Sequence, residues 1–206
     1  MSRKSRTFDA ASIAPTPWKN GGGTTLELAC WPAGAGIDEF QWRVSIATIR
    51  RDGPFSAFPG IDRIIMLLQG GGVHLGSANG SVDHRLDAPW QPYAFAGEAT
   101  IDCRLLQGES RDFNVMSRRE SLRAELRILR DAADLQPSPH GLVYAARGSW
   151  VADGQSLSAG NGLWWADGME PNDMEREMEQ CSLAPASGGD RILLAAQFWR
   201  SRAPVE

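Results

Sequence analysis

The segment most informative about the fold runs from Phe40 to Ile49 and reads FQWRVSIATI. One face of it carries large apolar side chains, namely Phe40, Trp42, Val44 and Ile46. The other face carries the polar side chains Gln41, Arg43 and Ser45. An alternation with a period of two residues is typical of a β-strand. The alternation alone leaves open whether Arg43 and Ser45 point into a protein interior or into solvent.

Seven further segments have the length and the β-branched, aromatic or aliphatic content of strands, and breaks rich in Gly or Pro separate them. They are Thr24–Ala29, Arg63–Gln69, Gly72–Leu75, Ala99–Leu106, Leu142–Ala146, Leu163–Ala166 and Ile192–Trp199. Many short strands predict an all-β barrel or sandwich. The segment Ser117–Leu135 fits a helix or a strand, and the acidic stretch Asp167–Glu179 is predicted to be a solvated loop or short helix.

Composition narrows the class of protein. The 206 residues include 25 acidic and 21 basic ones, and a net charge of −4 argues against a general nucleic-acid binder. No apolar run approaches the roughly 20 residues of a membrane helix, and no apolar stretch follows the charged first residues as in a secretory signal. We therefore expect a cytoplasmic protein without a membrane or nucleic-acid partner. The three separated cysteines predict neither a disulfide framework nor a zinc site.

Most catalytic motifs are missing from the sequence, including GxSxG, HExxH, the Walker A loop and GxGxxG. The triple glycine Gly21–Gly23 fits either a flexible lead into a strand or an anion-binding nest, with charge from Lys19 and hydrogen bonds from Asn20. Lys19 is one of only two lysines among the 21 basic residues, which draws attention to it. The segment Arg111–Met116 places polar residues beside an apolar Phe113 and fits either a mere turn or part of a binding site.

Together these segments resemble the HutD/Ves family. The resemblance covers most of residues 15–120 and rests on five motifs in order: PWKNGGGTTLEL (Pro17–Leu28), FQWRVSIATI (Phe40–Ile49), GPFSAFPGIDRIIMLLQG (Gly53–Gly70), FAGE (Phe95–Glu98) and RDFNVM (Arg111–Met116). It implies an all-β, cupin-type double barrel, that is, a bicupin of two RmlC-like jelly rolls. We place the first barrel at residues 1–118 and a second, smaller one at 119–206. Some members of the family occur with bacterial histidine-utilisation genes.

The resemblance also bears on the question of a metal. Metal-binding cupins carry an HxH motif and then a Glu before a strand that ends in Gly, and Gly70 matches that glycine. Ser56, Phe58 and Arg63 then stand where the two histidines and the glutamate would stand. None of these is an ordinary metal ligand, so we expect no metal and no cofactor. Arg63 suits a carboxylate instead, unless it merely pairs with Asp62 or another acid.

We therefore expect the first barrel to bind a small anionic metabolite, such as formylglutamate or urocanate, in a regulatory or sensing role. The expected ligand-binding residues are Trp18, Lys19, Asn20, Thr24, Arg43, Arg63, Asp112 and Asn114. The alternative is a metal-independent isomerase or hydrolase, but no catalytic residues are assigned. An enzyme of this kind would need a pair of residues for proton transfer, and the candidates are Asp83, His84 and Tyr93. Asp83 and His84 face opposite ways in a strand, and Tyr93 is placed in a loop. A third reading, an interaction module that uses residues 167–179, and the question of a homodimer both stay open.

Overall fold

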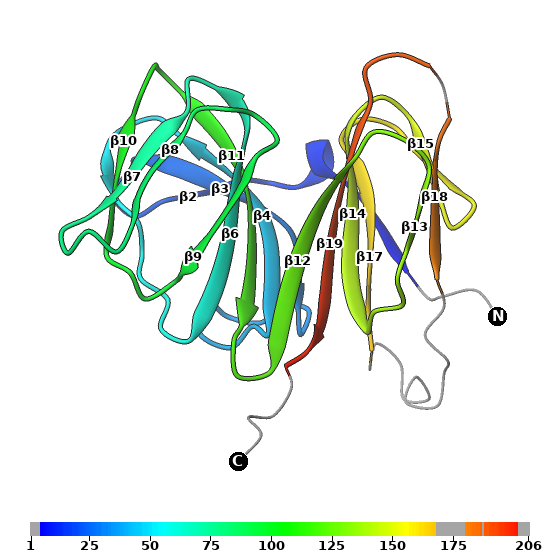
Figure 1. The fold of residues 1–206 in the computed structure, drawn as a ribbon, viewed down its shortest axis with the longest axis horizontal. Coiled ribbons are helices and arrows are strands. Elements are labelled where there is room, and N and C mark those ends of the chain that lie inside the picture. Colours follow the sequence, from blue (N-terminus) through cyan, green and yellow to red (C-terminus); the bar gives the residue numbers. More distant parts are fainter. Residues whose placement is uncertain (1–4, 168–179, 187, 202–206) are drawn as a thin grey trace. The chain divides into compact units, whose positions relative to one another are not determined.

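The computed structural model describes residues 5–167, 180–186 and 188–201, and these residues form two compact β-units (Figure 1). One unit, here the N-terminal unit, comprises Ile13–Arg123. The other, the C-terminal unit, comprises the described residues before Ile13 and after Arg123. The residues as far as Ser12 thus group with the second half, whereas the boundary expected from the sequence places them in the first barrel. The acidic residues 168–179 lie outside the described residues.

The N-terminal unit consists of two antiparallel sheets. The first has six strands in the spatial order β2 (Thr16–Pro17), β3 (Gly23–Trp31), β4 (Trp42–Ile49), β11 (Ser110–Arg118), β6 (Ile61–Gly70) and β9 (Pro92–Ala96). The second has four, in the order β5 (Gly53–Pro54), β10 (Ile101–Leu105), β7 (Val73–Ser77) and β8 (Asp83–Leu86). Strands distant in sequence are therefore neighbours in space, as in a jelly roll.

The C-terminal unit repeats this arrangement, with five strands in its larger sheet in place of six. Its larger sheet has the order β1 (Arg6–Asp9), β17 (Asn161–Ala166), β14 (His140–Arg147), β19 (Ile192–Arg200) and β12 (Leu122–Leu129). Its smaller sheet has the order β13 (Ala133–Leu135), β18 (Cys181–Pro185), β15 (Trp150–Ala152) and β16 (Gln155–Leu157). A short 3₁₀ helix, η1 (Ala10–Ser12), follows β1. The predicted all-β, cupin-type jelly-roll fold is thereby confirmed.

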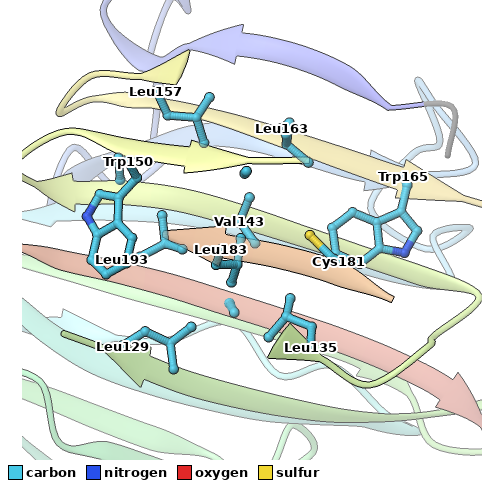
Figure 2. Close-up of a cluster of buried hydrophobic side chains, with 13 residues drawn as sticks. Leu129, Leu135, Val143, Trp150, Leu157, Leu163, Trp165, Cys181, Leu183 and Leu193 are labelled. Carbon is cyan, nitrogen blue, oxygen red and sulfur yellow. The ribbon is translucent and has the colours of Figure 1, made fainter. Parts of the chain in front are cut away.

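Each unit has its own apolar core between its two sheets. In the N-terminal unit, Ala47 and Ile65 of the larger sheet pack with Leu75 and Ile101 of the smaller one. In the C-terminal unit, Trp150 and Trp165 with leucines from both sheets fill the space (Figure 2). Burying one such aliphatic side chain contributes about 1.5–3 kcal/mol, so these clusters are a major source of stability.

The core decides which face of β4 is the inner one. Ala47 and Ile49 belong to the core, so Arg43 and Ser45 on the same face of the strand also point into the N-terminal unit. Trp42 lies on the opposite face and is fully buried there. The alternative that Arg43 and Ser45 face solvent is therefore wrong.

The eight predicted strands are all present, with ends that differ by a few residues. The ambiguous segment Ser117–Leu135 contains β12 and β13 and no helix. Arg111–Met116 is part of β11, so the alternative of a turn is wrong, and the predicted loop at Tyr93 is wrong because Tyr93 lies in β9. β11 is paired on both sides, with β4 and β6, so its backbone N–H and C=O groups are hydrogen-bonded. Its polar side chains interrupt the alternation of apolar and polar residues from which a strand is predicted. Within the described ranges, no helix is long and apolar enough to cross a membrane.

Candidate functional site

Four of the predicted site residues share the inner face of three adjacent strands. The pairing of β4, β11 and β6 places Arg43, Met116 and Arg63 in one row across the sheet. Asn114 lies in the next row, between Ser45 and Ile65, and Asp112 lies in the row after that. Residues directly opposite each other on neighbouring strands face the same side. The fold therefore gathers Arg43, Arg63, Asp112 and Asn114 inside the N-terminal unit.

Arg63 is a buried cation that has no carboxylate partner in the described part of the chain. It is 7% exposed, and its Nη2 donates a hydrogen bond to Oδ1 of Asn114 at 3.0 Å. Its Nε is buried without a hydrogen-bond partner. Burial, reinforced by the neighbouring charge of Arg43, lowers the pKa of Arg63 to about 10. The guanidinium is therefore still charged at pH 7.

Three aromatic rings surround this guanidinium. Its central carbon lies 5.3 Å from the ring centroid of Phe55, 5.6 Å from that of Phe58 and 5.0 Å from that of Phe95. Each ring face attracts a cation, by about 0.5–2 kcal/mol. The rings lower the free-energy cost of burying the charge of Arg63, but they carry no negative charge that could neutralise it.

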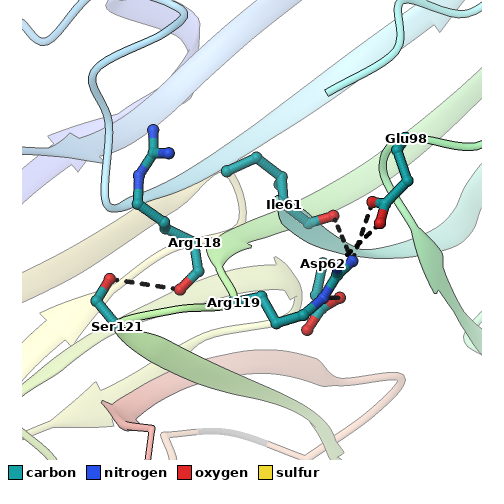
Figure 3. Close-up of polar contacts among 6 residues, drawn as sticks. All are labelled: Ile61, Asp62, Glu98, Arg118, Arg119 and Ser121. Carbon is teal, nitrogen blue, oxygen red and sulfur yellow. Dashed lines mark hydrogen bonds and ion pairs between the residues drawn. The ribbon is translucent and has the colours of Figure 1, made fainter. Parts of the chain in front are cut away.

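Asp62 does not neutralise Arg63. The two residues are neighbours on β6, so their side chains point to opposite faces of the sheet. Arg119 donates to Asp62 at 2.7 Å and to the two oxygens of Glu98 at 2.8 and 3.0 Å (Figure 3). The hydrogen bonds from Arg119 lower the pKa of Glu98 to about 2. The alternative that Arg63 pairs with Asp62 is therefore wrong.

Arg43 differs from Arg63 because it has a carboxylate partner. Its Nε donates to Oε2 of Glu27 at 2.6 Å, and its side chain is 17% exposed. The charge of Arg43 is thus compensated within the protein. Of the two inward-facing arginines, only Arg63 retains an uncompensated charge.

Asp112 is a buried carboxyl two residues from Asn114. It is fully buried; Oδ1 accepts a hydrogen bond from the Ser110 hydroxyl at 2.7 Å, and Oδ2 has no partner. Burial raises the pKa of Asp112 to about 7, although the bond from Ser110 opposes that rise. Burial, with the Asp112 charge next in importance, raises the pKa of the nearby Cys103 thiol to about 12. Asp112 is thus poised to gain or lose a proton near neutrality.

The other four predicted residues lie on and around β2 and β3. Trp18 donates from Nε1 to Thr25 at 2.7 Å and contacts the Phe55 ring edge-on, with centroids 6.2 Å apart. Trp18 therefore packs against one of the three rings that surround the Arg63 guanidinium. Lys19 is exposed to solvent. Thr24 pairs with Thr48 on the face of the sheet opposite Thr25 and Ala47. Neither Lys19 nor Thr24 is brought to the guanidinium.

The triple glycine forms a closed turn. The Gly21 amide donates to Trp18 O, and the Gly22 amide donates to Oδ1 of Asn20, both at 2.9 Å. A Cβ at Gly23 would lie 2.2 Å from the carbonyl oxygen of Thr48, so only glycine fits there. Because these two amides are already used, the interpretation of the loop as an anion-binding nest is wrong.

The C-terminal unit has Gly141 at the position that corresponds to Arg63. Both units contain a β-bulge. In the N-terminal unit, Arg111 and Asp112 of β11 pair with Gln69 and Leu67 of β6, so the register passes over one residue of β6. In the C-terminal unit, the register passes over one residue of β14 in the same way, between Ala145 and Arg147. Four residues before Leu67 lies Arg63, and four before Ala145 lies Gly141. A Cβ at Gly141 would lie only 2.1 Å from the Trp165 ring, which therefore occupies this position. Trp165 is paired with Gly141 as Phe95 is with Arg63.

The C-terminal unit does have a cleft of ≈ 390 Å³. It is lined by Glu125, Arg127, Asp134, Gln136, Gln197 and Trp199. One cation faces two carboxylates there, so an anionic ligand gains less than it would beside Arg63. The Arg63 region is the better candidate site for a carboxylate.

Several residues of the site are not singled out by the sequence alone. Phe55 and Phe58 stand out only as aromatic residues of a loop, and Glu27 and Ser110 carry no signal. The alternation of β6 identifies Arg63 as an inward residue, since Ile65 and Leu67 are on the same face. Its partner Asn114 is 51 residues away and becomes its neighbour only when β11 pairs with β6.

Comparison with known proteins agrees with this fold. The HutD family model matches residues 10–182 and so extends into both units. Protein Ves of Escherichia fergusonii is 38% identical over 162 residues, which are 78% of this chain and 83% of that protein. The structure of HutD from Pseudomonas fluorescens SBW25, solved in a formate condition, has a TM-score of 0.80 at 29% identity and covers 97% of this chain and 100% of its own. The family model covers well over half of the sequence, and the chain therefore belongs to the HutD/Ves family.

Proposed function

We propose that this protein is a ligand-binding cupin whose N-terminal unit binds a small carboxylate at Arg63. The observation that supports this is the buried guanidinium, whose single hydrogen bond goes to the neutral amide of Asn114. A buried charge without a counter-charge costs several kcal/mol. A bound carboxylate would supply that counter-charge and would accept two parallel hydrogen bonds from the guanidinium.

The proposed ligand class rests on the family resemblance and on the charge of Arg63. The resemblance implies an association with histidine utilisation, so the proposed ligands are acids of histidine degradation such as formylglutamate and urocanate. The proposed role is regulatory, in which the bound state reports the level of such an acid. Metal-independent binding is part of the proposal because Phe58 and Arg63, which by the resemblance stand at motif positions of cupin metal ligands, are not ordinary metal ligands. The Arg63 guanidinium lies 5.6 Å from the Phe58 ring.

A metal-independent isomerase or hydrolase is the second candidate, and Asp112 favours it. Its pKa of about 7 suits a general acid or base at neutral pH. Asp112 is fully buried, however, and its Oδ1 is occupied by Ser110. Binding therefore remains the preferred function.

Thermal-shift and calorimetric measurements with a panel of histidine-pathway acids test the proposal. At least one acid should raise the melting temperature of the wild type, and Arg63→Met should abolish that rise. Lys19→Ala is the matched control because Lys19 is an exposed cation of the same unit, and it should leave the rise unchanged. If no acid of the panel binds, or if Arg63→Met binds as the wild type does, the proposal fails.

Two further measurements separate the alternatives. Turnover of the binding acid, followed by NMR, would establish the enzyme in place of the sensor. Metal analysis of the purified protein should find no stoichiometric iron, manganese or zinc, and such a metal would contradict metal-independent binding.

A further inference from the structure

The cleft of the C-terminal unit lies where inward-facing side chains continue past the apolar core. On β12, Glu125 and Arg127 share the face of the core residue Leu129. On β19, the neighbouring strand, Gln197 shares the face of the core residue Ala195. The cleft of ≈ 390 Å³ is thus open space at the end of a barrel interior, and its volume is typical of a small-molecule site.

Gln197 has an acceptor that the protein does not use. The residue is 2% exposed, and its Nε2 donates to the backbone oxygen of Gln136 at 2.7 Å and to Oγ of Ser138 at 3.0 Å. The bond to a carbonyl oxygen fixes the orientation of the amide. Within the described ranges, no group donates to Oε1, and a buried amide oxygen without a partner is unfavourable. The corresponding residue of the N-terminal unit is the apolar Met116, so the fold itself does not require an amide here.

The charged side chains of the cleft are not paired with one another. Arg127 is partly exposed, and Glu125 and Asp134 are exposed. In the part of the chain that the structure describes, Arg127 forms no ion pair with either carboxylate. Asp134 accepts a hydrogen bond from the Ser182 hydroxyl at 2.8 Å, which leaves its negative charge uncompensated. The cleft therefore offers a guanidinium and two carboxylates to a ligand.

We infer that this cleft binds a free α-amino acid by its zwitterionic end. Arg127 binds the carboxylate of the amino acid, while Glu125 and Asp134 bind its ammonium group. Oε1 of Gln197 accepts one of the three N–H bonds of that ammonium group. A simple anion would be repelled by the two carboxylates and a simple cation by Arg127, whereas each charge of a zwitterion meets an opposite one. The inference does not depend on the carboxylate site proposed at Arg63.

Trp199 provides an apolar wall for the side chain of the amino acid. Its Nε1 donates to the carbonyl oxygen of Pro137 at 3.0 Å, which fixes the indole ring. Trp199 lies two residues after Gln197 on the same face of β19, so the ring and the amide are adjacent along the cleft. A large apolar side chain buries part of its surface against the indole. We therefore expect L-phenylalanine to bind more tightly than glycine.

Isothermal titration calorimetry with L-phenylalanine and two analogues tests the inference. 2-Phenylethylamine lacks the carboxylate of L-phenylalanine, and 3-phenylpropionate lacks its ammonium group. We expect the amino acid to bind at least roughly tenfold more tightly than either analogue. The three titrations are made with the wild type and with Arg63→Met, so that an acid bound at Arg63 is recognised by its loss in the variant. Binding of L-phenylalanine should be the same in both proteins, because Arg63 belongs to the other unit.

Variants of the cleft assign each charge to one end of the ligand. Arg127→Met should lower the affinity for L-phenylalanine to that for 2-phenylethylamine. The double variant Glu125→Gln/Asp134→Asn should lower it to the affinity for 3-phenylpropionate measured in Arg63→Met. Arg130→Met is the matched control, because Arg130 is an exposed cation that directly follows β12 and does not line the cleft. This control should bind L-phenylalanine as the wild type does.

Three results would overturn the inference. The first is the absence of L-phenylalanine binding up to about 10 mM. The second is undiminished binding in Arg127→Met, and the third is loss of binding in Arg63→Met, which would place the amino acid in the N-terminal unit. D-Glucose serves as a neutral probe, and a cleft that binds it in place of L-phenylalanine would be a polyol site. None of these results bears on whether a carboxylate binds at Arg63, except the third, which would support that site.

Discussion

Asn114 holds the guanidinium of Arg63 from the neighbouring strand, accepting a hydrogen bond from Nη2 at 3.0 Å. Both side chains are at least nine-tenths buried, so water cannot screen the charge effectively. A neutral amide orients the guanidinium without cancelling its charge. The cation is thus positioned in advance for an anion from outside the protein.

Asn114→Asp should convert the binding site into an internal ion pair. The new carboxylate has nearly the shape of the amide, and it would neutralise Arg63 in place of a ligand. We expect the melting temperature of the free protein to stay the same or to rise. Carboxylate affinity should fall by about 2–3 kcal/mol, or roughly 30- to 150-fold, in calorimetric titration. Undiminished affinity in this variant would show that the ligand binds elsewhere.

Arg63→Met should increase the stability of the free protein while it removes binding. Methionine fills a similar volume among the three phenylalanine rings and needs no counter-charge. Replacement of buried ionic groups by apolar ones has stabilised other proteins by about 1–4 kcal/mol. We expect a gain of about 1–3 kcal/mol in urea unfolding at pH 7. A large loss of stability would instead assign Arg63 a structural role.

The sequence pattern was sufficient to place Arg63 but not its surroundings. A period of two residues identifies the inward faces of β4 and β6, because the apolar residues on those faces are unambiguous. β11 has no such pattern, since Ser110, Asp112 and Asn114 are buried polar residues on its inner face. Its place between β4 and β6 depends on pairing across long stretches of chain, which local patterns do not encode.

For Lys19, the sequence suggested a role in binding that its position in the structure does not support. Its rarity among the basic residues suggested a selected role, but composition says nothing about where a side chain lies, and the residue is exposed in a turn. Asn20 and the glycines beside it serve the geometry of that turn. Their residue types fit an anion nest equally well, and only the hydrogen bonds of the folded chain separate the two interpretations.

Asp112 should make the stability of the wild type fall as the pH rises from 5 to 7. Its pKa is about 7 in the folded state, above its usual value of 3.8, so the folded protein holds a proton that the unfolded chain has released. The unfolding free energy should therefore fall by about 1.4 kcal/mol per pH unit in this range, or about 2–3 kcal/mol in all.

Asp112→Asn isolates this contribution, because the amide resembles the protonated carboxyl and still accepts from Ser110. Urea unfolding at pH 5 and pH 7 should show a smaller decrease for Asp112→Asn than for the wild type. Parallel pH profiles for the two proteins would mean that Asp112 titrates at its ordinary value.

Gly141→Ala tests whether Trp165 fills the space in the C-terminal unit that corresponds to the space of Arg63 in the N-terminal unit. The added Cβ would lie 2.1 Å from the indole ring, whose Nε1 is held by the carbonyl oxygen of Ser138 at 3.0 Å. Such overpacking costs about 1–3 kcal/mol. Gly36→Ala is the control, because its Cβ would have its nearest neighbour at 3.6 Å. Chemical denaturation should show a loss of stability for Gly141→Ala alone, with carboxylate affinity unchanged in both variants. If Gly141→Ala were as stable as the control, the core around Trp165 would have room at this position and would need to be reconsidered as a second binding site.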